Sequence, residues 1–472
     1  MPNKNDFPEK QAAIDEMSPI PKYYQLVNIL KTKYIDTQKK KLPTYQELMK
    51  EYSVSLATVK QAVEYLKNRG MLTTVKGGGI YVGSSKKIKL RIKLDSVHSL
   101  EVPVINDLIK RYEAHNRNVE VEFCDDPEQC DLCFAEESMI HYNCSRAGFH
   151  DLGTLIEKDL KGSGRLHEKL SGYFLFKGHM IAVPLVVMPV VLYYNKKLFK
   201  KESIAYPTEE WRWTDFLETA QKLTKDKDGI IRQYGFLKVI SNNRWPLFVI
   251  TNGGRIYDET LEHTFVSKPR CMEGLVFFRN LFSKYGIAAP DAYPEGNYDL
   301  PNLFAQGKTA MSLDSFYQYR DYYDALGEDL GITIPPWNSR KTTLLLSLCA
   351  FIPENARHCD ESLRLLKFLL KDETQTYIIR SRCGLPVAER LLKPEILSEY
   401  TDNENEKKNF NLFLRCIEIA VPYVVYPKHP EMGDRIHREF TLLWTNMQSV
   451  EKTVAQVEEI LASNGNQKGS AV

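Results

Sequence analysis

The 472-residue sequence lacks several patterns that would assign it to common functional classes. No uninterrupted apolar run approaches the roughly 18 residues of a membrane-spanning helix, and the first residues, MPNKNDFPEKQ, lack the apolar core of a secretory signal. The motifs HExxH and GxSxG are absent, and no pair of carboxylates can be singled out. We therefore expect a cytoplasmic protein with no membrane partner, no cofactor and no catalytic site.

The cysteines give only a weak signal for a disulfide framework or a metal site. The nine cysteines are an odd number without a secretion signal, so we expect reduced thiols. A zinc interpretation is possible where four cysteines gather near His141 and His150: Cys124, Cys130, Cys133 and Cys144. However, CDLCF has the pattern of a buried strand, in which residues three apart point to opposite faces. We favour small buried hydrophobic residues and predict no metal site.

Charge is unevenly distributed, although the net charge is only +2. Residues 1–93 hold 18 Lys and Arg against 8 Asp and Glu, a balance of +10, which leaves −8 for the remaining residues. A basic N-terminal part is typical of a domain that contacts a polyanion, whereas a solvated basic surface would show the same balance. Charge alone leaves the two interpretations open.

Three helices are predicted near the N-terminus. Tyr23, Leu26, Leu30 and Tyr34 form one apolar stripe after Pro21. In LPTYQELMKEY, Thr44 and Glu47 have the spacing of a capping box, which fixes the start of a second helix. The stretch SVSLATVKQAVEYLKNRG predicts a turn and a third helix that is capped by Ser55. Its inward side is expected to comprise Val59, Ala62, Val63 and Leu66.

Two short β-prone runs follow, joined by Lys76, Gly77, Gly78 and Gly79 in TTVKGGGIYVG. A nucleotide-phosphate loop needs a helix directly after its glycines, and here a strand follows. The pattern therefore predicts a hairpin, or wing, whose exposed backbone can approach DNA phosphates.

The stretch from Pro21 to Val82 resembles the winged-helix DNA-binding domain of the GntR regulator family, through LPTYQEL, VSLATVKQAVEYLKNRGML and GGGIYV in the family's order. The resemblance implies contacts with double-stranded operator DNA from the second helix, the start of the third helix and the wing. The predicted DNA-binding residues are Thr44, Gln46, Ser55, Leu56, Ala57, Thr58, Lys60, Lys76, Gly77, Gly78 and Gly79.

Three of these positions depart from the family, which usually has Arg where this sequence has Gln46, Leu56 and Gly78. Fewer guanidinium contacts imply weaker phosphate binding, so we expect reliance on Lys60, Lys76 and the avidity of a homodimer.

After a basic linker, GSSKKIK, the sequence alternates short apolar runs with helical stretches, which argues for an α/β domain. An ordered series of segments, among them FKGHMIAVPLVVMPVVLYYNKKLFKK, TNGGRIYDE and LFAQGKTAMSLDS, resembles the extracellular solute-binding proteins of ABC importers. That family has two α/β lobes with a ligand cleft between them. We therefore predict an α/β multidomain protein, with a winged helix-turn-helix at 19–85 and a two-lobed, periplasmic-binding-protein-like body of class II type at 90–465.

The resemblance implies a carbohydrate ligand, held by aromatic platforms and polar side chains. Matching the family's cleft segments gives these candidates: Arg244, Trp245, Asn252, Asp314, Phe316, Tyr317 and Trp337. For each aromatic residue the alternative is core packing, and for Asp314 it is a helix cap. An apolar segment, PLVVMPVV, stands where the family tends to have polar and aromatic cleft residues.

Three functions remain as hypotheses. The first is a transcription regulator in which a small solute closes the body and changes operator affinity. The second is a solute-binding module whose head does not bind DNA, motivated by the missing arginines. The third is a GntR-headed body related to pyridoxal-phosphate enzymes, for which we find neither a Schiff-base lysine nor its Asp partner.

Overall fold

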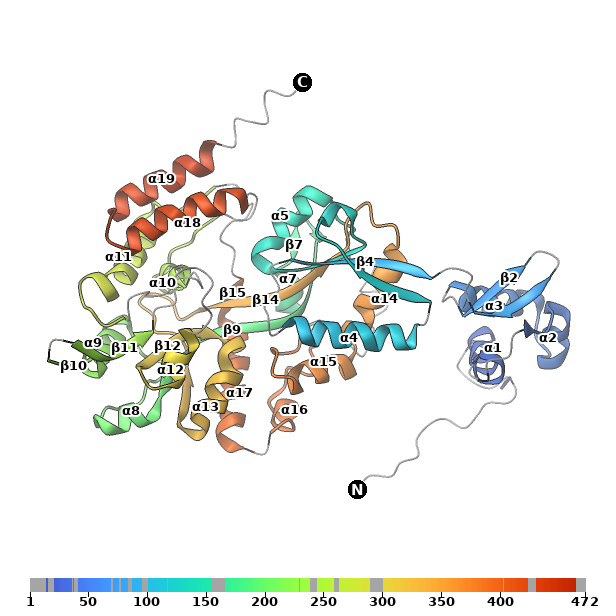
Figure 1. The fold of residues 1–472 in the computed structure, drawn as a ribbon, viewed down its shortest axis with the longest axis horizontal. Coiled ribbons are helices and arrows are strands. Elements are labelled where there is room, and N and C mark those ends of the chain that lie inside the picture. Colours follow the sequence, from blue (N-terminus) through green and yellow to red (C-terminus); the bar gives the residue numbers. More distant parts are fainter. Residues whose placement is uncertain are drawn as a thin grey trace. The chain divides into compact units, whose positions relative to one another are not determined.

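The computed structural model describes residues 14–15, 21–35, 37, 41–68, 71–75, 78–83, 87–95, 101–116, 118–153, 166–228, 230–237, 244–258, 263–288, 300–401, 403–422 and 430–463. The chain divides into two compact units, Met1–Ile92 with Ile105–Cys124 and Lys93–Val104 with Asp125–Val472 (Figure 1). Among the described residues no helix combines the length and apolarity needed to cross a membrane.

The first unit begins with a winged helix-turn-helix. Its elements are α1 (Lys22–Leu30), the π-helical turn η1 (Lys31–Ile35), β1 (Lys41–Leu42), α2 (Tyr45–Tyr52), α3 (Leu56–Asn68), β2 (Leu72–Val75) and β3 (Gly79–Val82). The three strands form an antiparallel sheet in the order β1-β3-β2, so the predicted hairpin is confirmed. The same unit contains most of β4 (Ile88–Asp95), its parallel partner β5 (Val119–Phe123), and most of α4 (Glu101–His115).

Local sequence signals account for the helix boundaries of this head. Thr44 and Glu47 form the predicted capping box at the start of α2, where the Glu47 amide donates to Thr44 Oγ1 at 3.3 Å and the Thr44 amide to Glu47 Oε2 at 2.7 Å. Ser55 Oγ accepts from the Thr58 amide at 3.1 Å. The predicted inward residues of α3 are all buried: Val59, Ala62, Val63 and Leu66.

The second unit is built around a long mixed sheet with helices packed against it. Its elements are η2 (Pro127–Gln129), β6 (Leu132–Glu136), α5 (Glu137–Ala147), α7 (Glu168–Gly172), β7 (Leu175–Phe176), β8 (His179–Met180), β9 (Val183–Asn195), α8 (Lys196–Lys201), α9 (Trp213–Leu223), β10 (Lys225–Lys227), β11 (Ile230–Leu237), α10 (Trp245–Thr251), α11 (Pro269–Ser283), α12 (Leu300–Ala305), β12 (Thr309–Ser315), η3 (Phe316–Gln318), α13 (Tyr319–Leu326), η4 (Gly327–Asp329), β13 (Leu330–Thr333), β14 (Thr343–Phe351), α14 (Cys359–Leu369), α15 (Asp372–Arg380), α16 (Pro394–Ser398), α17 (Glu404–Ile419), β15 (Ala420–Pro422), α18 (Pro430–Trp444) and α19 (Val450–Ser463).

One strand, β9, belongs to two lobes. The first part of β9 pairs with β14, which in turn pairs with β6, and we call this side the β6 lobe. From Val190 onward β9 pairs instead with β12 and β13, in what we call the β12 lobe. All thirteen residues of β9 are buried, which explains the apolar run PLVVMPVV as a crossing strand covered on both faces. Figure 1 shows β9 and β14 passing from one group of elements to the other.

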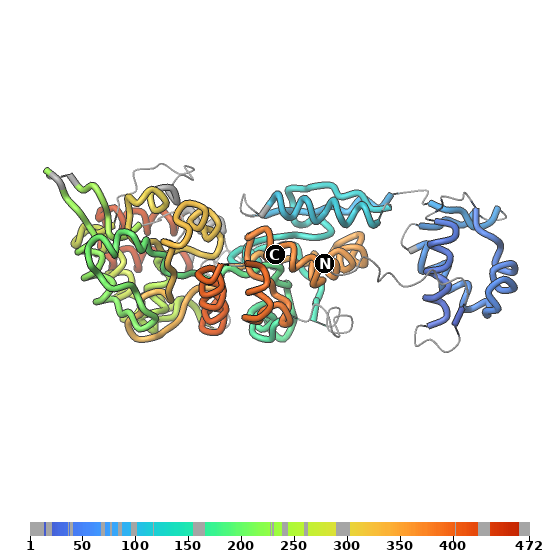
Figure 2. The backbone as a smooth tube through the Cα atoms, turned by 90° about the horizontal axis from the view of Figure 1, so that it is seen from below, coloured from blue at the N-terminus to red at the C-terminus, as the bar shows by residue number. Residues whose placement is uncertain are grey.

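The C-terminal helices complete the β12 lobe. Helices α18 and α19 contact each other and α11, as the red and yellow-green segments show in Figures 1 and 2. Trp444 packs edge-on against Phe278 at 5.0 Å between ring centroids, and Val454 and Val457 are buried in the same core. The C-terminal helix VEKTVAQVEEILAS thus packs on the body.

The cysteines correct one prediction and confirm another. Cys124 and Cys130 are disulfide-bonded, so the expectation of reduced thiols is wrong for these two, because a sequence separation of six residues does not show whether a loop brings two sulfurs together. The remaining cysteines are free. The last three residues of CDLCF open the buried strand β6, so the predicted buried strand is present there, and no group of metal-ligating side chains occurs in the described part of the chain.

Candidate functional site

The candidate DNA interface is the exposed side of α2, the first turns of α3 and the wing. Gln46, Leu56, Ala57, Lys60 and Gln61 are exposed, and Leu56 presents 42% of its surface although the large apolar side chains further along α3 are buried or half-buried. Such a helix start is the part that a helix-turn-helix protein places in the major groove. This surface has the backbone of a helix-turn-helix interface, and few of the side chains at its centre are charged.

Several predicted DNA-binding residues also stabilise the local fold. Thr44 and Ser55 are the helix caps described above, and Thr58 Oγ1 lies 2.9 Å from Ser55 Oγ. Lys76 and Gly77 lie outside the described residues. Gly78 and Gly79 are at the wing tip, where Gly79 has φ +110°, a conformation that favours glycine.

Sequence reasoning missed Lys41. It pairs with Tyr81 in the β1–β3 ladder, and its ammonium lies 5.4 Å from the Tyr81 ring centroid. A Cβ added to Gly79 would come within 2.7 Å of Lys41 Cε, so this exposed cation lies directly beside the wing tip. The three consecutive lysines at 39–41 were a signal for it.

The candidate ligand site in the second unit centres on a buried ion pair. Arg244, at the N-terminus of α10, donates to Asp314 Oδ1 at 2.8 Å, with side-chain exposures of 7% and 2%. Asp314 Oδ1 also accepts from the Ser315 amide, and Asp314 is not the cap of the following helix η3. Within the described part of the chain, Asp314 Oδ2 is buried without a hydrogen-bond partner, and a buried unsatisfied atom of this kind is typical of a site that receives a ligand or water.

One acidic side chain of the β6 lobe, Glu136, lies within electrostatic reach of Arg244. Burial raises the pKa of Glu136 from 4.5 to about 7, opposed by the positive charge of Arg244 and reinforced by Asp95. Burial also raises the pKa of Glu137, whose carboxylate accepts from the amide and hydroxyl of Ser347. These acidic residues were missed by sequence reasoning, although two of them, Glu136 and Glu137, stand directly where the strand of CDLCFAEE ends.

Asp95 lies at the edge of this acidic group. Asn143 donates to Asp95 Oδ2 at 2.7 Å, and Lys93 forms an ion pair with the same oxygen at 3.4 Å. Carboxylates, an amide and two cations thus come from both lobes. Such a set can hydrogen-bond a neutral polyhydroxylated ligand.

The other predicted ligand residues form packing contacts or local hydrogen bonds. Trp245 is 2% exposed and stacks on Phe440 at 4.5 Å between centroids. Phe316 is wholly buried against Tyr319 and Phe413, and Tyr317 is half-buried beside it.

Asn252 and Trp337 belong to neighbouring segments. Asn252 is buried, donates to Arg270 O and Glu273, and accepts from Asn338 at 2.7 Å. The ring of Trp337 lies 3.2 Å from the Arg212 guanidinium. The structure thus brings Arg244 and Asp314 together and places Asn252 near Trp337, and the ligand roles of all seven residues stay predictions.

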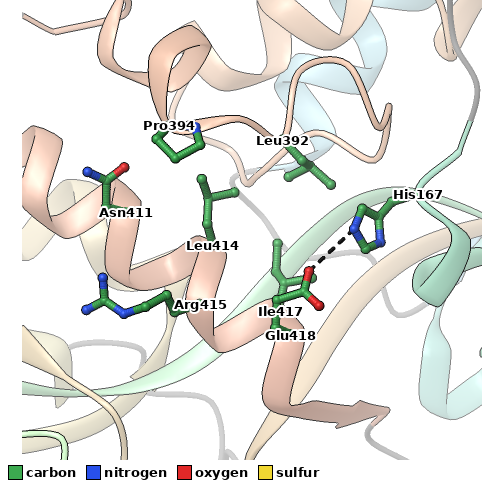
Figure 3. A pocket seen from close by; sticks show the side chains of 8 residues that line it. All are labelled: His167, Leu392, Pro394, Asn411, Leu414, Arg415, Ile417 and Glu418. Carbon is green, nitrogen blue, oxygen red and sulfur yellow. Dashed lines mark ion pairs between the residues drawn. The ribbon is translucent and has the colours of Figure 1, made fainter.

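Two cavities lined by described residues lie elsewhere in the second unit. The first, of about 400 Å³, is shown in Figure 3, where His167 Nε2 is paired with Glu418 Oε1 at 3.4 Å. The second, of about 470 Å³, lies between α17, β13 and the end of β9. None of the predicted ligand residues lines either cavity.

Fold and site together define a protein with a winged-helix head and a two-lobed binding body. Residues 29–82 match the model of the family "Bacterial regulatory proteins, gntR family", and residues 144–376 match "Bacterial extracellular solute-binding protein". The chain is thus a GntR-type winged-helix head fused to a solute-binding-protein-like body. Both families are regulatory or binding families, not enzyme families.

Individual relatives agree with this division. A putative binding protein of Brucella abortus is 22% identical over 277 residues, which are 57% of this chain and 64% of the relative, so the match spans less than two thirds of that protein. The HTH-type transcriptional repressor NagR of Bacillus subtilis is 37% identical over 76 residues, 16% of this chain and 31% of the relative.

Solved structures match the body. An ABC substrate-binding protein of Listeria monocytogenes in complex with cycloalternan superposes with a TM-score of 0.68 at 20% identity, over 80% of this chain and 99% of that one. Maltose-bound MalE3 of T. maritima gives 0.64 at 17% identity, over 80% and 99%. At these identities the likeness establishes the two-lobed fold.

Proposed function

We propose that this protein is a cytoplasmic transcription regulator that binds operator DNA as a homodimer and senses a small carbohydrate. In this proposal residues 19–85 contact DNA and residues 90–465 receive the solute. The observation that carries the proposal is the fusion itself, a GntR-type head joined to a solute-binding-protein-like body. Structurally similar proteins hold carbohydrates, among them cycloalternan and maltose, which supports this ligand class.

The ligand site lies between the lobes in this proposal. Arg244 and Asp314 come from the β12 lobe and Glu136 from the β6 lobe, so a solute that contacts all three favours closure. A ligand changes DNA affinity only through its different affinities for the open and closed states. Such couplings are typically about 1–3 kcal/mol, or roughly 5- to 150-fold in affinity.

DNA binding is tested by fluorescence anisotropy of the full-length protein on a duplex from its own upstream region, at about 50 and 200 mM salt. We expect binding that weakens as salt rises. The slope of the logarithm of the binding constant against the logarithm of salt concentration should be smaller in magnitude by about 1 in Lys60→Ala. Lys67→Ala is the matched control, because Lys67 lies in the last turn of α3 and pairs with Glu64. No binding at low salt would refute the regulator.

A second function, a solute-binding module without DNA binding, is favoured by one observation. Leu56 and Gln46 are exposed at the centre of the interface, where arginines would contact phosphates. A salt slope near zero on both upstream and random duplexes, together with carbohydrate binding in a thermal-shift screen, would establish this alternative.

A further inference from the structure

The cavity of about 470 Å³ in the β12 lobe differs in chemistry from the Arg244–Asp314 site. It is lined by one side of α17, by β13, by the residues that join β9 to α8, and by Pro207–Glu209. Its volume falls within the range of small-molecule sites. Because α17 contacts β9, β13 and β14, a ligand here would bind beside the strands that cross between the lobes.

A half-buried ammonium without an anionic partner lines this cavity. Lys196 Nζ donates to Asn405 Oδ1 at 2.7 Å and to Glu328 O at 2.8 Å, both of which are neutral oxygens. No carboxylate within the described ranges lies at ion-pair distance from Lys196. Glu328 and Asp329 are close enough to raise its pKa, but burial lowers that pKa more, and the carboxylate of Asp329 is paired with Lys197 at 3.1 Å.

A second ammonium lines the same cavity. Lys408 is exposed on α17, and its positive charge is near enough to lower the pKa of Lys196 further. Lys408 likewise has no carboxylate at ion-pair distance in the part of the chain that the structure describes. Within the described ranges neither ammonium has a carboxylate at ion-pair distance, so an anion that contacts both would stabilise these two like charges.

Among the described residues that line the cavity, the one carboxylate is already neutralised. Glu209 is paired with Arg415, which also lines the cavity, and with Lys341 at 3.6 Å. Thr208, Thr333 and the buried amide of Asn409 add neutral polar groups, and Ile332 and Leu412 add apolar surface. The lining therefore offers positive charge, hydrogen-bonding groups and space beyond that of a bare ion.

We propose that this cavity binds the phosphate group of a small phosphorylated metabolite, with Lys196 and Lys408 as its charged contacts. A dianionic phosphate matches two ammonium groups and accepts several hydrogen bonds at once. The apolar residues Ile332 and Leu412 would contact the organic part of the ligand. The site requires neither the DNA-binding head nor the proposed carbohydrate site, so it stands or fails independently of the proposed function.

The test is isothermal titration calorimetry of the full-length protein at constant ionic strength, with glycerol 3-phosphate, inorganic phosphate, glycerol and succinate as titrants. We expect saturable binding of glycerol 3-phosphate, weaker binding of inorganic phosphate and no binding of glycerol. Tighter binding of succinate than of both phosphates would overturn the assignment of a phosphate site.

Matched variants locate the site. Lys408→Gln should weaken glycerol 3-phosphate binding roughly ten- to hundredfold, because a charge-assisted hydrogen bond is lost. Lys407→Gln removes the same charge one residue away on α17, where the ammonium pairs with Glu404 at 2.8 Å, and should bind like the wild type. Equal affinities of the two variants, or no saturable binding of either phosphate by the wild type, would refute the proposal.

Discussion

The buried pair Arg244–Asp314 allows a quantitative test of the second unit. At 2.8 Å and an effective dielectric constant of about 20, the attraction between unit charges is about 6 kcal/mol. Removing two ions from water costs several kcal/mol each, so the net contribution of the intact pair is expected to be small. Removing one partner leaves the other charge buried, and we expect Asp314→Leu or Arg244→Met alone to lower the free energy of unfolding by about 3–5 kcal/mol.

The double variant Arg244→Met/Asp314→Leu should recover most of this loss. It leaves no unpaired charge and fills the space with apolar side chains, so its stability should lie within about 1 kcal/mol of the wild type or above it. The single losses sum to at least about 6 kcal/mol, so the double-mutant cycle then yields a coupling energy of at least about 5 kcal/mol.

Urea unfolding monitored by tryptophan fluorescence is the appropriate assay. All five tryptophans lie in residues 211–444, so the signal reports the second unit and not the winged-helix head. Losses below about 1 kcal/mol for each single variant, or single-variant losses that simply add in the double variant, would show that the pair is solvated and would refute this description of the site.

Three further predictions concern single residues. Because burial raises the pKa of Glu136 to about 7, the folded state binds more protons than the unfolded state between pH 4.5 and 7, so stability should fall as pH rises through this window. Glu136→Gln should therefore be more stable than the wild type by about 1–3 kcal/mol at pH 8 and by almost nothing at pH 4. The free energies of unfolding of both proteins are measured by urea titration at the two pH values. A stability difference that is the same at both pH values would contradict the raised pKa. Thr44→Ala should lower the stability of the head by about 1 kcal/mol through loss of the cap on α2, measured by circular dichroism; an unchanged melting curve would show that the capping box contributes nothing. Leu56→Arg should tighten DNA binding and increase the magnitude of the salt slope by about 1, and an unchanged slope would place Leu56 outside the DNA contact.

Much of the head could be predicted because its signals are local. Thr44 and Glu47 are three residues apart, and their reciprocal hydrogen bonds depend only on the start of one helix. The inward residues of α3 follow the helical period, and the glycine-rich hairpin follows turn chemistry.

The ligand site depends on contacts that no local pattern encodes. Arg244 and Asp314 are 70 residues apart and meet only because β12 and α10 come together in the fold. Glu136 gains its raised pKa from burial in tertiary structure. Trp245 and Phe316 illustrate the same limit, because an aromatic residue that forms a platform and one that packs in a core have the same sequence signal.

The most direct test of the central claim compares operator binding with and without solute. A thermal-shift screen of the full-length protein first identifies a stabilising carbohydrate, since a ligand at about 100 times its Kd stabilises by about 2.7 kcal/mol. The Kd for the upstream duplex is then measured by fluorescence anisotropy in the absence and presence of that carbohydrate at saturation. We predict a change of roughly 5- to 150-fold in that Kd. An identical Kd in both conditions would contradict it.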